Sequence, residues 1–289
     1  MGQDMIYSRI FGGLGNQLFQ YATARAVSLR QGVELVLDTR LAPPGSHWAF
    51  GLDHFNISAR IAEPSELPPS KDNFFKYVMW RAFGHDPAFM RERGLGYQSR
   101  IAQAPDGTYL HGYFQSERYF ADVLDHLENE LRIVTPPDTR NAEYADRIAS
   151  AGHTVSLHVR RGDYVETSKS NSTHATCDEA YYLRALARLS EGKSDLKVFV
   201  FSDDPEWVRD NLKLPYDTTP VGHNGPDKPH EDLRLMSCCS DHVIANSTFS
   251  WWGGWLDRRP EARVVGPAKW FNNPKLVNPD ILPERWIAI

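Results

Sequence analysis

The sequence is poor in cysteine, in clusters of basic residues and in long apolar runs, and each shortage excludes a class of protein. It has 3 cysteines in 289 residues, and neither their odd number nor their spacing suggests a disulfide framework or a zinc site. The formal net charge is -5, without a lysine and arginine run long enough to bind nucleic acid. No apolar stretch approaches the ~20 residues of a membrane-spanning helix. Any anionic partner is therefore expected to be small and to be held by a local cluster of charge.

Signals for secretion are also weak. The N-terminus lacks the succession of charged, apolar and small residues that marks a signal peptide. Three glycosylation sequons, at Asn56, Asn171 and Asn246, are interpreted as coincidental, because a glycan on Asn246 would block the ligand site inferred below. The sequence shows no internal repeat. With 41% hydrophobic and 12% aromatic residues, the chain is expected to form one large or two modest domains.

Strand and helix signals alternate along most of the chain, and they predict an α/β fold with parallel sheets. A proline pair at residues 136–137 cannot continue a helix, so we place the domain boundary there, with domains at 1–135 and 136–289. Expected strands lie at 5–10, 33–37, 108–114, 154–159, 196–201, 242–245 and 263–266. Expected helices lie at 16–31, 74–82, 116–132, 141–150, 178–190 and 230–239, and a last helix follows the strand at 242–245 and ends at 256.

The most informative segment is HVRRGDY, at residues 158–164. It places two guanidinium groups at the carboxyl end of a predicted strand, which is where open α/β sheets bind ligands. An arginine fork matches two phosphate oxygens, so Arg160 or Arg161 is a candidate pyrophosphate clamp. The alternatives are a pair of surface arginines, or an RGD tripeptide at residues 161–163 that serves adhesion.

Two further segments have a strand followed by a turn and a helix. GGLGNQ, at residues 12–17, lacks the complete dinucleotide fingerprint, but Asn16 is expected to cap a helix that favours an anion or a sugar hydroxyl. A purely structural turn is the alternative. NSTFS, at residues 246–250, opens another helix, and its side chains and backbone N–H groups are candidates for the same phosphates. The tryptophans at 251 and 252 are interpreted as packing residues.

Four segments together resemble glycosyltransferase family eleven, the alpha-1,2-fucosyltransferases. They are GGLGNQLFQYA (12–22), HVRRGDY (158–164), VFVFSDDPEW (198–207) and NSTFSWW (246–252). The stretch from 42 to 105 carries no motif of this kind. The resemblance implies a GT-B fold, in which two Rossmann-like domains face each other across a cleft. The first would be the acceptor side, and the second would bind the nucleotide sugar.

The resemblance further implies an inverting enzyme that transfers L-fucose from GDP-fucose to the 2-hydroxyl of a terminal galactose. Acceptors of this class include lactose and O-antigen or capsule glycans, and a lipid-linked acceptor would bring the enzyme to the inner face of the membrane. Because relatives in eukaryotes are generally anchored, the missing anchor favours a bacterial cytoplasmic enzyme. Alternatives are a protein O-fucosyltransferase or heptosyltransferase, and a non-catalytic glycan-binding protein.

Within this interpretation, residues from all four segments are candidates for contacts with the donor, GDP-fucose. Arg160, Ser247 and Thr248 would meet the charge that develops on the leaving phosphate. The other candidates for donor contacts are Asn16, Gln17, Arg161, Asp203, Asn246 and Ser250. Asp203 or Asp204 suits the guanine edge or a ribose hydroxyl, although Asp204 precedes a proline and is more readily interpreted as a helix cap. The two acids are adjacent rather than spaced as D-x-D, so no metal or other cofactor is expected.

The general base is the least determined of the catalytic groups. Asp163 is the first candidate, since it follows the arginine clamp by two positions. Two neighbouring arginines would lower its pKa, however, and it would then only orient them. His158 is a second candidate, with nucleotide binding or core packing as its alternatives. His111 and Glu117 are candidates from the first half.

Overall fold

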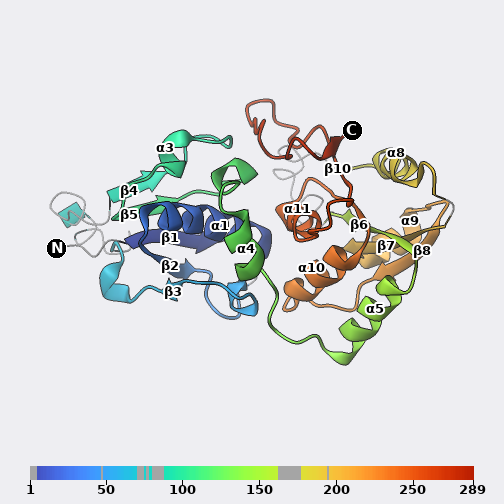
Figure 1. Ribbon diagram of the computed structural model, residues 1–289, viewed down its shortest axis with the longest axis horizontal. Helices are drawn as coiled ribbons and strands as arrows, with labels where there is room; N and C mark the ends of the chain where they lie inside the picture. The colour runs from blue at the N-terminus through green and yellow to red at the C-terminus, as the bar shows by residue number, and fades with distance from the viewer. Residues whose placement is uncertain are drawn as a thin grey trace. The chain divides into compact units, whose positions relative to one another are not determined.

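The computed structural model describes residues 5–46, 48–69, 75, 78–79, 88–161, 177–193 and 195–289. The chain divides into two compact units, Met1–Arg132 and Ile133–Ile289. Each unit is built on its own parallel β-sheet with helices packed against it (Figure 1). The predicted α/β class is confirmed. The expected helix at 74–82 falls mostly outside the described residues.

The first unit contains a five-stranded sheet in the order β3-β2-β1-β5-β4, in which all pairings are parallel. Its strands are β1 (Met5–Phe11), β2 (Glu34–Leu41), β3 (Arg60–Ile61), β4 (Ala88–Arg91) and β5 (Thr108–His111). Its helices are α1 (Leu14–Gln31), α3 (Ser99–Ala102) and α4 (Leu124–Glu130), with 3-10 turns η1 (Leu52–His54), η2 (Pro64–Glu66) and η3 (Glu117–Tyr119).

Helix α1 begins earlier than the sequence pattern predicts. Gly12 has a φ of 75° and Gly13 is extended, so the chain turns sharply and the helix starts at Leu14. Gly13 is the N-cap, and its carbonyl accepts from the backbone N–H groups of Asn16 and Gln17 at 2.9 and 3.1 Å. The expectation that Asn16 caps the helix is therefore wrong, because the backbone of Gly13 already occupies that position. Gly32, in a left-handed conformation, ends the helix as predicted.

The predicted helix at 116–132 is also wrong, since the chain there forms the short turn η3 and the separate helix α4. The adjacent rings of Tyr119 and Phe120 are both fully buried. Phe120 ends η3 with a φ of -136°, outside the helical region, so the segment cannot continue as one helix. Helix α4 is tied to α1 through Glu130, which accepts from the Tyr21 hydroxyl at 2.5 Å and from Arg25 at 2.8 Å.

The second unit contains a six-stranded sheet in the order β11-β10-β9-β6-β7-β8, again parallel at every pairing. Its strands are β6 (His153–Val159), β7 (Leu196–Ser202), β8 (Asp217–Val221), β9 (Asp241–Val243), β10 (Val264–Gly266) and β11 (Ile287–Ala288). Its helices are α5 (Thr139–Ala149), α8 (Glu179–Ser190), α9 (Pro205–Asn211), α10 (Pro229–Cys238) and α11 (Thr248–Trp255).

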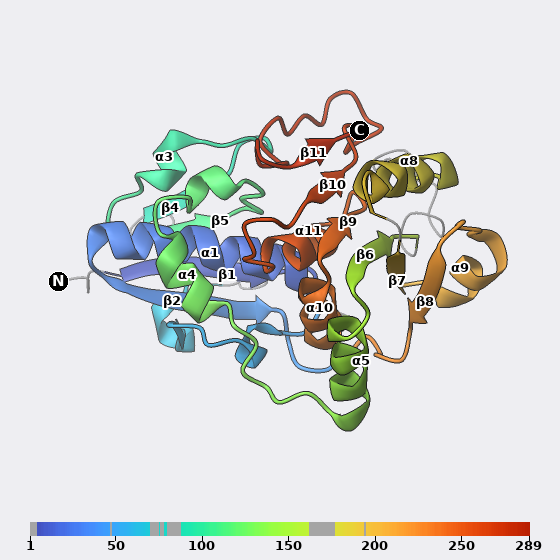
Figure 2. The ribbon, with the colours of Figure 1, turned by 45° about the vertical axis from the view of Figure 1, so that its right-hand side comes forward.

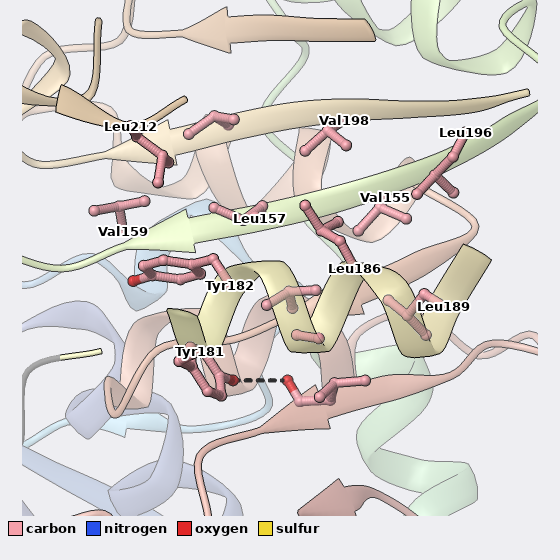
Figure 3. Packing of buried hydrophobic residues seen from close by; sticks show 14 of the residues in the cluster. Val155, Leu157, Val159, Tyr181, Tyr182, Leu186, Leu189, Leu196, Val198 and Leu212 are labelled. Atoms are coloured by element: carbon pink, nitrogen blue, oxygen red, sulfur yellow. Dashed lines mark hydrogen bonds between the residues drawn. The ribbon is translucent and has the colours of Figure 1, made fainter. Parts of the chain in front are cut away.

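Helices cover both faces of this second sheet, with α8 and α9 on one side and α5, α10 and α11 on the other (Figure 2). Alternate residues of β6 serve the two sides: Val155, Leu157 and Val159 pack under α8 (Figure 3). Tyr181 of α8 donates its hydroxyl to the carbonyl of Ile244 at 2.6 Å, which fixes the helix to the end of β9. Position 158, on the opposite face, is thereby directed toward α11.

Helix α11 is tightly packed, as predicted for its tryptophans. Trp251 and Trp252 are fully buried, and the indole N–H of Trp251 donates to the carbonyl of Ile281 at 2.7 Å. Gly254 allows the helix to approach β10 closely: a Cβ there would lie 3.1 and 3.2 Å from the two methyl groups of Val264. This packing fixes the position of the first turn of α11.

We predict that Gly254→Ala destabilises the protein by up to about 2 kcal/mol. Overpacking costs ~1–3 kcal/mol and outweighs the ~1 kcal/mol by which alanine favours a helix over glycine, because the branched Val264 side chain cannot move aside. In a Val264→Ala background the overlap is removed, and Gly254→Ala should then stabilise. Denaturant unfolding of the four variants measures both effects, and the same loss in both backgrounds would contradict the packing argument.

Candidate functional site

The second sheet has a topological switch point beside β6. From β6 the chain proceeds to β7 and β8 on one side, and then returns to β9, β10 and β11 on the other. The carboxyl ends of β6, β7 and β9 therefore lie next to one another. The three segments that the sequence analysis selected in this half follow these strands, at Arg160, Asp203 and Ser247. Ligands of open α/β sheets bind at such a point.

Asp203 connects the ends of β6 and β7. One of its carboxylate oxygens lies 2.9 Å from Nη1 of Arg160, and the other accepts the backbone N–H of Arg161 at 2.9 Å. Both oxygens therefore hold the arginine segment. The Arg160 guanidinium remains about one-quarter exposed. A contact of Asp203 with guanine or ribose stays a prediction. The carboxylate would have to make this contact while its oxygens also hold Arg160 and the backbone of Arg161.

Arg161 is held by helix α9. Its guanidinium lies over the ring of Trp207, 3.7 Å from the centroid, and its Nε lies 3.5 Å from a carboxylate oxygen of Asp204. Asp204 is also the N-cap of α9 and accepts from the N–H of Trp207 at 3.0 Å. The interpretation of Asp204 as a helix cap is thus confirmed. Trp207 ends the VFVFSDDPEW segment, but its place in this cluster was not predicted from the sequence.

His158 is buried beneath this cluster. It is 4% exposed, and its ring packs 5.7 Å from that of Phe249 on α11. Burial lowers the pKa of His158 to about 4, with Asp203 raising it and Arg160 lowering it further. The ring is therefore neutral at pH 7. Its Nδ1 atom has no hydrogen-bond partner within the described residues.

The first turn of α11 completes this edge of the sheet. Ser247 is the N-cap residue but makes no side-chain capping bond, and Thr248 begins the helix. Asn246 and Ser250 have internal partners instead: the Asn246 amide donates to the carbonyl of Trp270 at 3.2 Å, and the Ser250 hydroxyl donates to that of Ser247 at 3.3 Å. These contacts shape the turn and leave Ser247 and Thr248 as its better candidates for binding an anion.

In the first unit, the two amides of the GGLGNQ turn have different environments. Gln17 is fully buried, donates to the carbonyls of Gly12 and Ala49 at 2.9 Å each, and accepts from the N–H of Gly51 at 3.1 Å. It joins the turn to the loop after β2. Asn16 is partly exposed and accepts from the side-chain amide of Gln115 at 3.0 Å. Gln115 was not identified from the sequence.

The candidates for the general base are only partly located. Asp163 lies outside the described residues. His111 ends β5 and stacks on Phe11 with ring centroids 5.3 Å apart, and Glu117 begins η3. The proposed role of each stays a prediction.

A second group resembles a nucleophilic triad but is structural. The Ser156 hydroxyl lies 2.8 Å from Nδ1 of His242, whose Nε2 lies 2.9 Å from a carboxylate oxygen of Asp257. Ser156 and His242 are buried within the sheet, and Arg259 also binds Asp257, at 2.7 Å. Hydrogen bonds from His242 and Arg259 outweigh burial and lower the pKa of Asp257. With no access for a substrate, the group serves to pair buried polar atoms.

Two negative findings concern the described part of the chain. It contains no group of three histidine, cysteine, aspartate or glutamate side chains arranged to hold a metal ion. None of its helices combines the length and the hydropathy needed to cross a membrane.

We predict that His158 titrates near pH 4 rather than near its ordinary 6.5. Burial disfavours the charged ring, so protonation of His158 destabilises the folded protein. The contribution of His158 to the free energy of unfolding is complete above pH 6.5 and is lost as the pH falls toward 4. Replacing Arg160 with Ala should raise the His158 pKa, and Asp203→Asn should lower it. Histidine NMR titration, with His158→Gln to assign the signal, measures these shifts. A wild-type midpoint near 6.5 would show that the ring is not buried as described.

The chain is similar to known glycosyltransferases. The model of Glycosyl transferase family 11 matches residues 78–289. An alpha-1,2-colitosyltransferase from Escherichia coli is 32% identical, over 99% of both chains. The O-antigen biosynthesis glycosyltransferase WbnK from Escherichia coli is 28% identical over 92% of this chain and 95% of its own length. The galactoside 2-alpha-L-fucosyltransferase Sec1 of Mus musculus is 27% identical over 99% of this chain and 74% of its own.

Solved structures agree on the fold. NodZ alpha-1,6-fucosyltransferase, soaked with GDP-fucose, aligns with a TM-score of 0.51 and 16% identity over 88% of this chain and 93% of its own. A mutant of Arabidopsis thaliana FUT1 in complex with GDP aligns with a TM-score of 0.53 and 13% identity over 91% of this chain and 70% of its own. These neighbours have the GT-B fold, which confirms the predicted fold class. The extent of the family match and the relative at 32% identity establish that the chain belongs to glycosyl transferase family 11.

Proposed function

We propose that the protein transfers L-fucose from GDP-fucose to the 2-hydroxyl of a terminal galactose, with inversion at the anomeric carbon. The observation that carries this proposal is the position of Arg160, which follows β6 and is held by Asp203 at the switch point of the second sheet, where β6 lies between β7 and the strand that leads to α11. Family membership supports the transfer of a sugar. The 1,2-linkage is supported by the names of the relatives, a colitosyltransferase and a galactoside fucosyltransferase.

The chemistry follows from the charge that must be stabilised. Breaking the bond between the sugar and the diphosphate leaves additional negative charge on the β-phosphate. Arg160 provides a fixed positive charge, and the hydroxyls of Ser247 and Thr248 and the N–H groups of the first turn of α11 provide donors. Because packing and Asp203 hold these groups in place before the substrate arrives, little reorganisation is needed in the transition state.

Asp163 remains the proposed general base. Among the other candidates, His158 is less suited, because a buried ring with a pKa of about 4 is a weak base at neutral pH. Comparing Asp163→Asn with Asp163→Ala separates the two roles of Asp163. If Asp163 is the base, both variants lose kcat and keep donor affinity, whereas an orienting role would let Asp163→Asn keep most of its kcat.

One alternative donor is supported by a specific finding, the colitosyltransferase relative at 32% identity. Colitose is L-fucose without its 3-hydroxyl group. A site that hydrogen-bonds this hydroxyl discriminates against colitose strongly, whereas an apolar surface at that position discriminates weakly. Comparing kcat/KM for GDP-fucose and GDP-colitose therefore decides between the two donors.

For the acceptor we propose a galactose-terminated glycan, either free as in lactose or as part of an O-antigen or capsule polysaccharide. The O-antigen biosynthesis relative from Escherichia coli supports this class. Such a role would place the enzyme in the bacterial cytoplasm, or at the inner face of the membrane if the acceptor is lipid-linked.

The direct test is to incubate the protein with GDP-fucose and lactose, and to measure the GDP released and the linkage of the product by NMR. We expect fucose α-linked to the 2-hydroxyl of galactose. Substitution at another hydroxyl would contradict the proposed linkage. Failure to release GDP with lactose and with other galactosides would contradict the proposed donor or acceptor.

We predict that Arg160→Ala lowers kcat with GDP-fucose on the order of a hundredfold to a thousandfold, the scale for removal of one preorganised charge-stabilising group. Arg160→Lys should recover only part of this, because a single ammonium group cannot replace the guanidinium fork. Arg188→Ala, at an exposed ion pair on α8, is the matched control and should retain wild-type activity. Near-normal turnover by Arg160→Ala would exclude the central assignment.

We also predict that activity survives removal of divalent cations. Arginine and the donors at α11 provide the charge neutralisation for which other transferases use a metal ion. Initial rates should be similar after treatment with EDTA and after exchange into metal-free buffer, although magnesium can accelerate the release of GDP. An enzyme that is inactive in EDTA and recovers only with a divalent cation would require a metal site.

A further inference from the structure

Two side-chain amides meet at the carboxyl edge of the first sheet. Asn16 lies in the first turn of α1, directly after β1, and Gln115 follows β5, the strand that pairs with β1. Nε2 of Gln115 donates to Oδ1 of Asn16 at 3.0 Å, across 99 positions of the sequence.

This hydrogen bond determines how the Asn16 amide is turned. Because Oδ1 accepts from Gln115, the amide is held with Nδ2 on the side away from Gln115, and Nδ2 can only donate to a ligand. Nδ2 lies close to Gly12, since a Cβ added to Gly12 would lie 3.0 Å from this nitrogen. It makes no hydrogen bond within the described part of the chain. Asn16 thus offers a hydrogen-bond donor to an oxygen atom.

The loop that carries Gln115 is built in a fixed and unusual conformation. Phe114 is fully buried and has a φ of 54°, which non-glycine residues rarely adopt. The Glu92 carboxylate accepts from the backbone N–H groups of Tyr113 and Phe114, at 2.7 and 3.0 Å. Gly112 has no room for a side chain, since a Cβ would lie 2.5 Å from that of Glu92. The backbone that leads into Phe114 is therefore constrained, and Gln115 follows Phe114 directly.

Within the turn at 12–17, only one of the two amides suits a substrate contact. The amide of Gln17 makes three hydrogen bonds to backbone groups in a fully buried position. Asn16 is partly exposed, and Gln115 engages only its oxygen. The loop that ends at Gln115 keeps a strained backbone at Phe114, and such strain persists only where the surrounding structure enforces it. The loop can therefore hold Gln115, and through it the Asn16 amide, in one orientation.

We propose that Gln115 is a positioning residue, which turns the Asn16 amide so that its N–H groups donate to an oxygen of the nucleotide sugar. The proposal rests on the proposed function and adds to it a residue outside the phosphate cluster. Gln115 acts through Asn16 and has no separate contact with the substrate.

Gln115→Glu is the sharpest test, because it reverses the hydrogen bond. A carboxylate can only accept, so Asn16 must turn to donate to it and would then present Oδ1 to the substrate. We expect kcat/KM for GDP-fucose to fall by about ten- to a hundredfold, the range for a lost hydrogen bond to a charged group. Asn16→Asp, which still accepts from Gln115 but cannot donate, should show a similar loss. Gln103→Glu, an exposed glutamine on the same unit, is the matched control and should have no effect.

A double-mutant cycle separates positioning from a purely structural role. In an Asn16→Ala background, Gln115→Glu should cost less than twofold, because the group on which it acts is missing. An equal loss in both backgrounds, or a shift confined to the KM for lactose, would overturn the proposal.

Thermal unfolding and circular dichroism identify any variant that fails to fold. If Gln115→Glu is such a variant, Gln115→Met serves as the uncharged replacement, and we expect it to lose less activity than a folded Gln115→Glu would. A wild-type enzyme inactive with GDP-fucose would refute the proposed function itself, whereas an active one with an additive cycle refutes only this inference.

Discussion

The carboxylate of Asp203 is the constraint on which the candidate site depends. Its two oxygens reach the Arg160 guanidinium and the Arg161 backbone, so the chain leaving β6 is fixed to the end of β7. An isolated surface ion pair contributes little to stability. Here its effect is positional: it keeps a guanidinium at the switch point of the sheet while about a quarter of that group stays exposed. The neutral, buried His158 below adds no competing charge to this arrangement.

Other parts of the chain apply the same principle, in which buried packing orients a few exposed polar groups. The tryptophans of α11 and the close approach at Gly254 set the position of Ser247 and Thr248. In the first unit, Glu92 holds the loop that leads to Gln115, which in turn orients Asn16. In each case the polar group belongs to a turn after a buried strand. The strands give the turn its place, and the loop sequence gives it its chemistry.

The central strands and their motifs were predictable from their β-branched and apolar residues: β7 contains an apolar run, and β6 alternates apolar with polar residues and ends at the arginine pair. Short edge strands were not: β8 contains Pro220 and is largely exposed, so neither its pattern nor its length distinguishes it from a loop. The start of α1 was misplaced because glycine backbone, rather than the Asn16 side chain, caps it. The contact of Gln115 with Asn16 joins residues far apart in the chain, and no local pattern reveals such a pairing. Asp163 lies outside the described residues, so its predicted role is unaltered.

The central claim is that Arg160 and the first turn of α11 bind the diphosphate of the donor. A crystal structure of the protein with bound GDP tests this most directly. We expect the β-phosphate within hydrogen-bonding distance of the Arg160 guanidinium and of the Ser247 or Thr248 hydroxyl, with the ion pair to Asp203 retained. A diphosphate bound at another edge of the sheet, or out of reach of Arg160, would contradict this account.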